Sequence, residues 1–202
     1  MTNEPATCEI CGEPMPASEE MFKFHGYSGP CPKPPLPSIE CHGLDTKERV
    51  CFYEQDFYVL SNFSAFTLQW KGLRFDTSEA AYHWEKFQGP IADGLECQII
   101  SERLRTAPSA HLAFKWANDN KLFRRNDWDD VKVGIMRDIL RAKAAQHEYV
   151  HRKLLATGDR ELVENSWRDA WWGIGPNGDG KNMLGKLWME VRAELRAAAG
   201  AA

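Results

Sequence analysis

Glu79, His83 and Lys86 stand at a spacing that could support acid–base or nucleophilic chemistry. On an α-helix, positions i, i+4 and i+7 share one face, so a carboxylate, an imidazole and an amine would lie together. Such groups, when fixed on a rigid element, can transfer protons and attack electrophilic carbon. From spacing alone, however, a solvent-exposed Glu–Lys face with the histidine as a spacer is the more common arrangement. The spacing therefore raises the catalytic hypothesis without deciding it.

The local sequence predicts the helix that would carry these side chains. Residues 76–78, Asp-Thr-Ser, offer N-cap candidates, and Glu79 follows at the spacing of a capping box. Gly89 and Pro90 are typical helix terminators, so we expect the helix to run to Gln88.

Short strands are predicted before this helix. Residues 51–63, CFYEQDFYVLSNF, are rich in aromatic and β-branched side chains and predict a strand that turns at Ser61 and Asn62. The segments FTLQW and LRF flank Lys71 and Gly72, which is the pattern of a hairpin with a two-residue turn.

Helices are predicted over most of the remaining chain. Residues 93–155 are largely helical in pattern, and ELVENS at 161–166 predicts a short strand. A glycine-rich loop, WWGIGPNGDGKN, precedes an amphipathic helix over residues 183–199. This order predicts an α+β fold, mostly helical with a few short strands. An apolar stripe lies within the long helical region at Val131, Ile135, Ile139 and Ala142, with Arg137, Arg141 and Lys143 off it.

Composition bounds the class of protein. The 202 residues are 43% hydrophobic and include eight Trp and ten Phe, which is enough for a packed core. The net charge of -4 argues against broad electrostatic binding of nucleic acid, although Arg124, Arg125 and Lys132 form a local basic group. No stretch approaches the roughly 18 apolar residues of a membrane span, and the polar N-terminus resembles no signal peptide, so we expect a cytoplasmic protein without membrane contact.

The first 45 residues have the pattern of a small zinc module. Cys8 and Cys11 have the C-x2-C spacing that brings two thiolates to one tetrahedral ion, and His25 and Cys31 would complete the site. Cys41 or His42 could replace either member of the second pair, and free thiols in a disordered tail are the alternative. We expect a structural zinc that holds residues 1–45, which end in a proline-rich linker, ahead of a domain over residues 46–202. The module could dock a partner, contact nucleic acid weakly or cover the larger domain.

Four ordered motifs resemble the NADAR (YbiA-like) N-glycosidase family. The first motif in the chain is Leu60-Ser-Asn-Phe-Ser64, followed by FDTSEAAYHWEKFQ at residues 75–88. Asp127-Trp128, together with residues 131–143, is similar to the family's central helix. Asp169-Ala-Trp-Trp-Gly173 and residues 180–187 are similar to its C-terminal loop and helix. Together these motifs cover about residues 51–195, and the N-terminal cysteine segment lies outside them.

The resemblance implies an enzyme that hydrolyses the N-glycosidic bond between a ribose and a base. Its substrate would be ADP-ribose joined to guanine, free or in nucleic acid, or alternatively a riboflavin-pathway intermediate. Glu79 would stabilise the oxocarbenium-like transition state or activate water. Lys86 would attack the anomeric carbon and form a Schiff base, and Asp169 would bind ribose hydroxyls or assist proton transfer.

The resemblance also implies a set of substrate-binding residues and no cofactor for catalysis. Trp172 would stack on a base, and the glycine-rich loop before residue 183 would cradle phosphate with its backbone amides. A hypothesis of another class is a non-catalytic sensor of ADP-ribose or NAD that interacts through the zinc module. The predicted substrate contacts are Asn62, His83, Arg125, Trp172, Gly173, Lys181 and Asn182.

Overall fold

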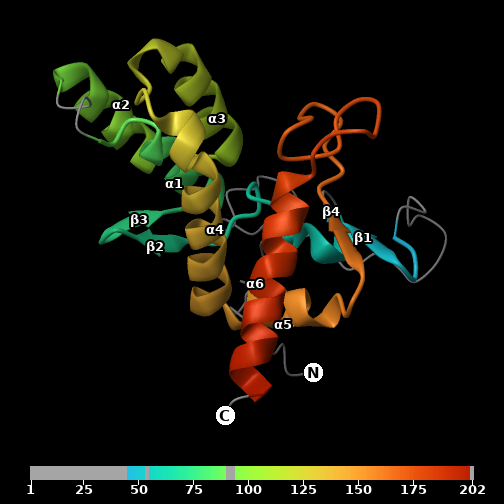
Figure 1. The fold of residues 1–202 in the computed structure, drawn as a ribbon. Helices are drawn as coiled ribbons and strands as arrows, with labels where there is room; N and C mark the ends of the chain where they lie inside the picture. Colours follow the sequence, from blue (N-terminus) through green and yellow to red (C-terminus); the bar gives the residue numbers. More distant parts are fainter. Residues whose placement is uncertain (1–44, 53–54, 90–93, 201–202) are drawn as a thin grey trace, which may run out of the picture.

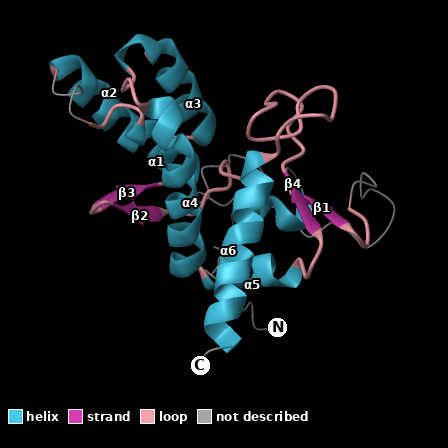
Figure 2. Cartoon of the chain, in the orientation of Figure 1, coloured by secondary structure: helices cyan, strands magenta, loops and turns pink. Residues whose placement is uncertain are grey.

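The computed structural model describes residues 45–52, 55–89 and 94–200 (Figure 1). Helices dominate this part of the chain, and short strands form two separate two-stranded sheets (Figure 2). The mostly helical α+β fold expected from the sequence is therefore confirmed. In chain order the elements are β1 (Arg49–Cys51), η2 (Gln55–Leu60), β2 (Leu68–Trp70), β3 (Leu73–Phe75), α1 (Ser78–Glu85), α2 (Leu95–Arg105), α3 (Ala110–Asp119), η3 (Lys121–Phe123), α4 (Trp128–Gln146), α5 (Glu148–Ala156), β4 (Glu161–Val163) and α6 (Met183–Gly200).

The strands β2 and β3 form the predicted hairpin. They pair antiparallel, with Leu68 opposite Phe75 at the open end. Lys71 and Gly72 have positive φ angles of 49° and 78°, as a type I′ turn requires. The hairpin leads directly into α1 and so fixes where that helix begins.

The strands β1 and β4 pair in parallel. The strand β1 is shorter than the sequence predicted. The strand expected over residues 51–63 ends at Cys51, and residues 55–60 form the 3-10 helix η2. Val59 and Leu60 are buried there, so the apolar composition reflects burial and not an extended backbone. The strand predicted within residues 161–166 is confirmed as β4.

The helix α1 begins as predicted but ends early. Thr77 is the N-cap, and its side chain accepts a hydrogen bond from the backbone N–H of Ala80. The predicted run to Gln88 stops at Glu85, because the N–H groups of residues 86–88 donate to the carbonyls three positions back. Lys86 therefore lies in a tightened last turn beyond the regular helix.

The helices α4 and α6 run side by side at the centre of the molecule (Figure 1). Met136, Ile139 and Leu140 of α4 are fully buried, as is Trp188 of α6, whose Nε1 donates to the carbonyl of Leu60 at 2.7 Å. Their apolar faces are part of the main hydrophobic core. Both helices begin at the end of the molecule where the loop after β4 lies, so they anchor the base of that loop.

The cysteine and histidine residues predicted to bind zinc lie outside the described residues, as does the proline-rich linker. Within residues 45–52, 55–89 and 94–200, no group of three or more His, Cys, Asp and Glu side chains is placed to hold a metal ion. The same segments contain no helix with the length and apolar character that crossing a membrane requires. The zinc ligands named above are Cys8, Cys11, His25 and Cys31, with Cys41 and His42 as alternatives.

Candidate active site

Glu79 and His83 form a buried pair on α1. His83 Nε2 lies 2.7 Å from Glu79 Oε1, and the two residues are 2% and 8% exposed, respectively. Burial lowers the pKa of His83, although the neighbouring carboxylate acts in the opposite direction. A neutral imidazole can donate its Nε2–H to the carboxylate and thereby orient it. The solvent-exposed face that spacing alone favours is excluded for these two residues.

Lys86 is held over aromatic rings on the same side of α1. Its Nζ lies 5.3 Å from the ring centroid of Tyr82 and 5.6 Å from that of Trp128. Trp128 is the first residue of α4, and the backbone N–H of Arg125 donates to the Lys86 carbonyl at 2.8 Å. The start of α4 thus packs against the end of α1 and covers the lysine stem.

The surroundings of Lys86 increase the fraction of its amine that is neutral. Burial lowers the pKa of Lys86 to about 8 despite the attraction of Glu79 and Asp169, and the cations Arg124 and Lys132 lower it as well. An amine becomes a usable nucleophile once burial and cationic neighbours reduce its pKa in this way. The same influences show that Glu79 and Asp169 lie within electrostatic range of the amine.

Glu79, Lys86 and Asp169 form a cluster of charged groups. Glu164 joins this cluster from the end of β4, although no sequence motif predicted it. The residue is 7% exposed, and burial raises its pKa to about 8. Glu79 and Asp169 add to the rise, whereas Lys143 opposes it. The sequence did contain one signal for Glu164. Its carboxyl group directly follows the apolar residues 162–163 at the end of a strand, a position at which an acid becomes buried and can be functional.

Asp169 shapes the Trp-Trp-Gly loop. Its Oδ1 accepts hydrogen bonds from the backbone N–H groups of Trp171 and Trp172, each at 2.8 Å, which is an Asx-type turn. Gly173 closes the loop onto β4, since a Cβ there would lie 2.8 Å from the carbonyl oxygen of Glu164. The predicted Gly173 therefore has a packing role, and Asp169 commits one oxygen to the loop.

The glycine-rich loop does not form the phosphate cradle expected from its sequence. The N–H groups of its four glycines donate to carbonyls of the loop itself, and those of residues 181–184 donate to the carbonyls of residues 170–173. Backbone amides that are already paired are not free to bind an anion. The glycines concerned are Gly173, Gly175, Gly178 and Gly180.

Positively charged side chains lie over the ring of Trp171, beside the cluster. The Nζ atoms of Lys181 and Lys132 lie 3.8 Å and 4.2 Å from its ring centroid. Lys132 and Arg124 also pair with Asp129, at 2.7 Å and 3.0 Å. The Trp171 Nε1 is buried and has no hydrogen-bond partner among the described residues. An anionic ligand would stabilise this grouping of cations.

Two predicted contacts, Asn62 and Trp172, lie at the cluster. Asn62 is buried and its carbonyl accepts from the N–H of Glu79 at 3.1 Å, while its side-chain Oδ1 has no partner among the described residues. Trp172 is partly buried and meets the ring of Tyr82 edge to face, with centroids 5.5 Å apart. Trp172 also packs against the core, and its stacking on a base remains a prediction.

Two other predicted contacts are engaged within the protein. The guanidinium of Arg125 donates to both oxygens of Asp127, at 2.6 Å and 2.7 Å. Asn182 joins β4 to α6, because its Oδ1 accepts from the N–H of Glu164 and its Nδ2 donates to the carbonyl of Leu162. These bonds give both residues structural roles, and contact with a substrate remains a prediction for them.

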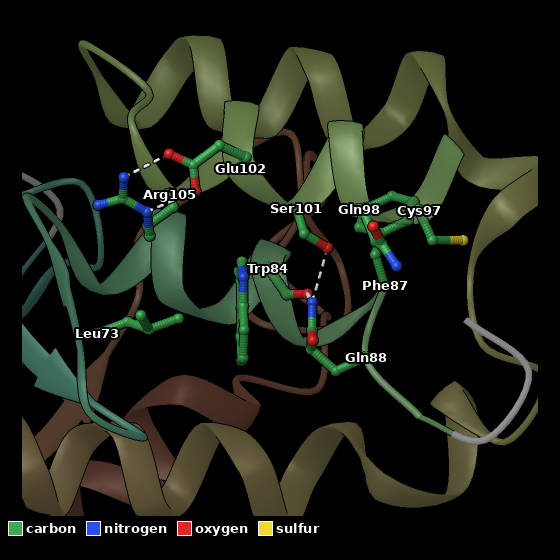
Figure 3. A pocket seen from close by; sticks show the side chains of 9 residues that line it. All are labelled: Leu73, Trp84, Phe87, Gln88, Cys97, Gln98, Ser101, Glu102 and Arg105. Atoms are coloured by element: carbon green, nitrogen blue, oxygen red, sulfur yellow. Dashed lines mark hydrogen bonds and ion pairs between the residues drawn. The ribbon is translucent and has the colours of Figure 1, made fainter. Parts of the chain in front are cut away.

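A pocket lies between α2 and the segment formed by α1 and the turn after it (Figure 3). Trp84 lines it from α1 and Gln88 from the turn that follows this helix, and Gln88 Nε2 donates to Ser101 Oγ of α2 at 2.7 Å. Trp84 is five positions after Glu79, which places the two on different sides of the helix. None of the predicted site residues lines this pocket, so it is not the candidate active site.

Residues 51–196 match the protein family described as the NADAR domain. N-glycosidase YbiA of Escherichia coli (strain K12) is 36% identical over 140 residues, which cover 69% of this chain and 82% of that protein. A riboflavin biosynthesis protein of Vibrio vulnificus is 37% identical over 152 residues, 74% of this chain, but the match spans only 39% of that protein. The NMR structure of the E. coli protein YbiA superposes with a TM-score of 0.67 at 33% identity, covering 79% of this chain and 92% of that one.

Proposed function

This chain belongs to the NADAR domain family, and from that premise we propose that it is an N-glycosidase, a hydrolase acting on the bond between ribose and a base. The observation that supports this most is the buried Glu79–His83 pair within electrostatic range of Lys86, whose amine has a lowered pKa. A carboxylate and a neutral amine are the two groups that covalent cleavage of such a bond requires.

In the proposed reaction, the neutral amine of Lys86 attacks the anomeric carbon of the ribose. The bond from that carbon to the base breaks, and its electron pair leaves with the base. Loss of an Nζ proton and opening of the ribose ring then give a Schiff base, and water adds to it to release the sugar and restore the amine. Glu79 stabilises the positive charge that develops on the sugar, and His83 keeps that carboxylate in place.

We propose ADP-ribose joined to guanine, free or in nucleic acid, as the substrate class. The cations around Trp171 support a ligand with phosphate charge close to the reacting sugar, with Lys132 and Lys181 as the contacts. Trp172 and Asn62 would contact the base, and Asp169 the ribose through its remaining oxygen. A riboflavin-pathway phosphate is the second candidate, because the relative in Vibrio vulnificus is named a riboflavin biosynthesis protein.

The test compares both substrate classes with two single variants. Wild-type protein, Glu79→Ala and Lys86→Ala are incubated with ADP-ribosylated guanosine DNA, with the corresponding free nucleotide and with riboflavin-pathway intermediates, and the released base is quantified. We expect each variant to lower turnover at least about 100-fold. The exposed Glu161→Ala serves as the matched control and should keep wild-type turnover. Unchanged turnover in both variants would reject the proposed site, and binding without turnover by wild type would favour a sensor.

A further inference from the structure

Glu164 is fixed in place by its own backbone. Its N–H donates to Asn182 Oδ1 at 3.0 Å, and its carbonyl accepts from the N–H of Ile174 at 3.1 Å. Gly173 packs against that carbonyl so closely that no side chain fits there. Loop and strand thus hold Glu164 from two sides, which sets the position of its side chain as a rigid scaffold does.

The Glu164 carboxyl group is buried without being satisfied. Its Oε2 is inaccessible to solvent and has no hydrogen-bond partner among the described residues. A buried polar oxygen without a partner destabilises a protein and calls for a functional explanation. The described charged groups that act on it are Glu79 from α1, Asp169 from the loop and Lys143 from α4.

These neighbours favour the protonated form of Glu164. Burial disfavours the negative form most, and two further carboxylates within electrostatic range add to this effect, so the pKa rises to about 8. Lys143 opposes them, but it is 0% exposed and donates its Nζ hydrogens to the Ser61 carbonyl and Ser64 Oγ, at 2.8 Å and 2.7 Å. The hydrogen bonds described for Lys143 thus go to residues 61 and 64, and none goes to Glu164.

We propose that Glu164 is the general acid that protonates the departing base, an inference that rests on the proposed N-glycosidase function. As the bond from the anomeric carbon to the base nitrogen breaks, the electron pair goes to the base and the Glu164 proton neutralises it. The carboxylate left behind recovers a proton from the water that later hydrolyses the Schiff base. In this proposal Glu79 acts on the sugar and Glu164 on the base, which divides the two roles between two buried acids.

The test measures kcat/KM against pH for wild type and Glu164→Gln. Glutamine keeps the shape and can donate a hydrogen bond but cannot release a proton. For wild type we expect kcat/KM to fall above about pH 8, as the acid loses its proton. For Glu164→Gln we expect kcat to fall at least about 100-fold with little change in KM, and this alkaline fall to disappear. Glu161→Gln, on the same strand and exposed, should behave as wild type.

A second substrate separates lost chemistry from lost folding. The same substrate with an N7-methylated guanine carries a cationic base that departs without taking up a proton. If Glu164 supplies the proton, Glu164→Gln should be impaired far less on the methylated substrate, by about 10-fold or more in the ratio of the two rates. Equal losses of rate on both substrates would overturn the proposal. So would a kcat/KM profile of Glu164→Gln that still falls at alkaline pH as the wild-type profile does. Absence of turnover in wild type would instead reject the N-glycosidase function itself.

Discussion

The rate of N-glycosidic cleavage by this protein should rise with pH between 6 and 7 in proportion to the neutral fraction of Lys86. With a pKa of about 8, the amine is about 1% neutral at pH 6, about 9% at pH 7 and about 50% at pH 8. A lysine with an ordinary pKa near 10.5 would be only about 0.03% neutral at pH 7. The lowered pKa therefore makes about 300-fold more nucleophile available at neutral pH.

The assay follows kcat/KM and the trapped covalent intermediate over the same pH range. We expect kcat/KM to rise about 10-fold from pH 6 to 7 and to bend near pH 8. Borohydride should reduce the Schiff base and add the mass of the sugar to the peptide containing Lys86. Lys86→Met should abolish both signals, and Lys115→Met, an exposed lysine of α3, should preserve them.

Three outcomes would refute this reasoning about Lys86. A flat profile below pH 7 would show that no amine of this pKa controls the rate. A bend above pH 9 would show that burial and the cations Arg124 and Lys132 do not lower the pKa as the structure indicates. Sugar attached to another lysine would assign the nucleophile elsewhere, and the fully buried Lys143, whose pKa is lowered to about 7, would then be the next candidate.

Three further predictions test the loop, the cationic group and the N-terminal segment. In a denaturation assay, Gly173→Ala should lower the free energy of unfolding by about 1–3 kcal/mol, because its Cβ would meet the Glu164 carbonyl. Gly134→Ala, in open space on α4, should raise the free energy of unfolding by about 0.5–1 kcal/mol in the same assay. Removing the Lys132 and Lys181 charges together as Gln should raise KM for the phosphorylated substrate roughly 10-fold at low salt and much less at high salt, whereas an unchanged KM would exclude them from phosphate binding. Purified protein should contain about one zinc per chain, and Cys8→Ser should lose it if the cysteine cluster binds the metal.

The parts of the fold that local sequence signals specify were predictable. The hairpin follows from Lys71 and Gly72, which both take positive φ, and the start of α1 follows from the Thr77 cap. The parallel pairing of β1 with β4 was not predictable, because three-residue strands far apart in sequence carry no local signal for one another. That pairing is what brings Glu164 into electrostatic range of Glu79.

Helical periodicity did not predict which charged side chains of α4 are buried; the folded structure determines this. Periodicity placed Lys143 off the apolar stripe of α4, yet its side chain is completely buried, since the Ser61 carbonyl and Ser64 Oγ provide acceptors inside the core. The same limit affected the glycine-rich loop, where composition predicted free amides and the folded loop pairs them internally. Composition reports which groups are present, but only the fold determines which of them are already bonded.

The hydrogen bonding of the acids explains how several carboxyl groups can share the candidate active site. Three ionised carboxylates in one cluster would repel one another strongly, and a proton on one of them relieves the repulsion. Glu79 meets a histidine and Asp169 meets two backbone amides, whereas Glu164 Oε2 meets no donor among the described residues. The proton is therefore held where no donor compensates a negative charge, at Glu164, and this difference in hydrogen bonding assigns the acid in the proposed reaction.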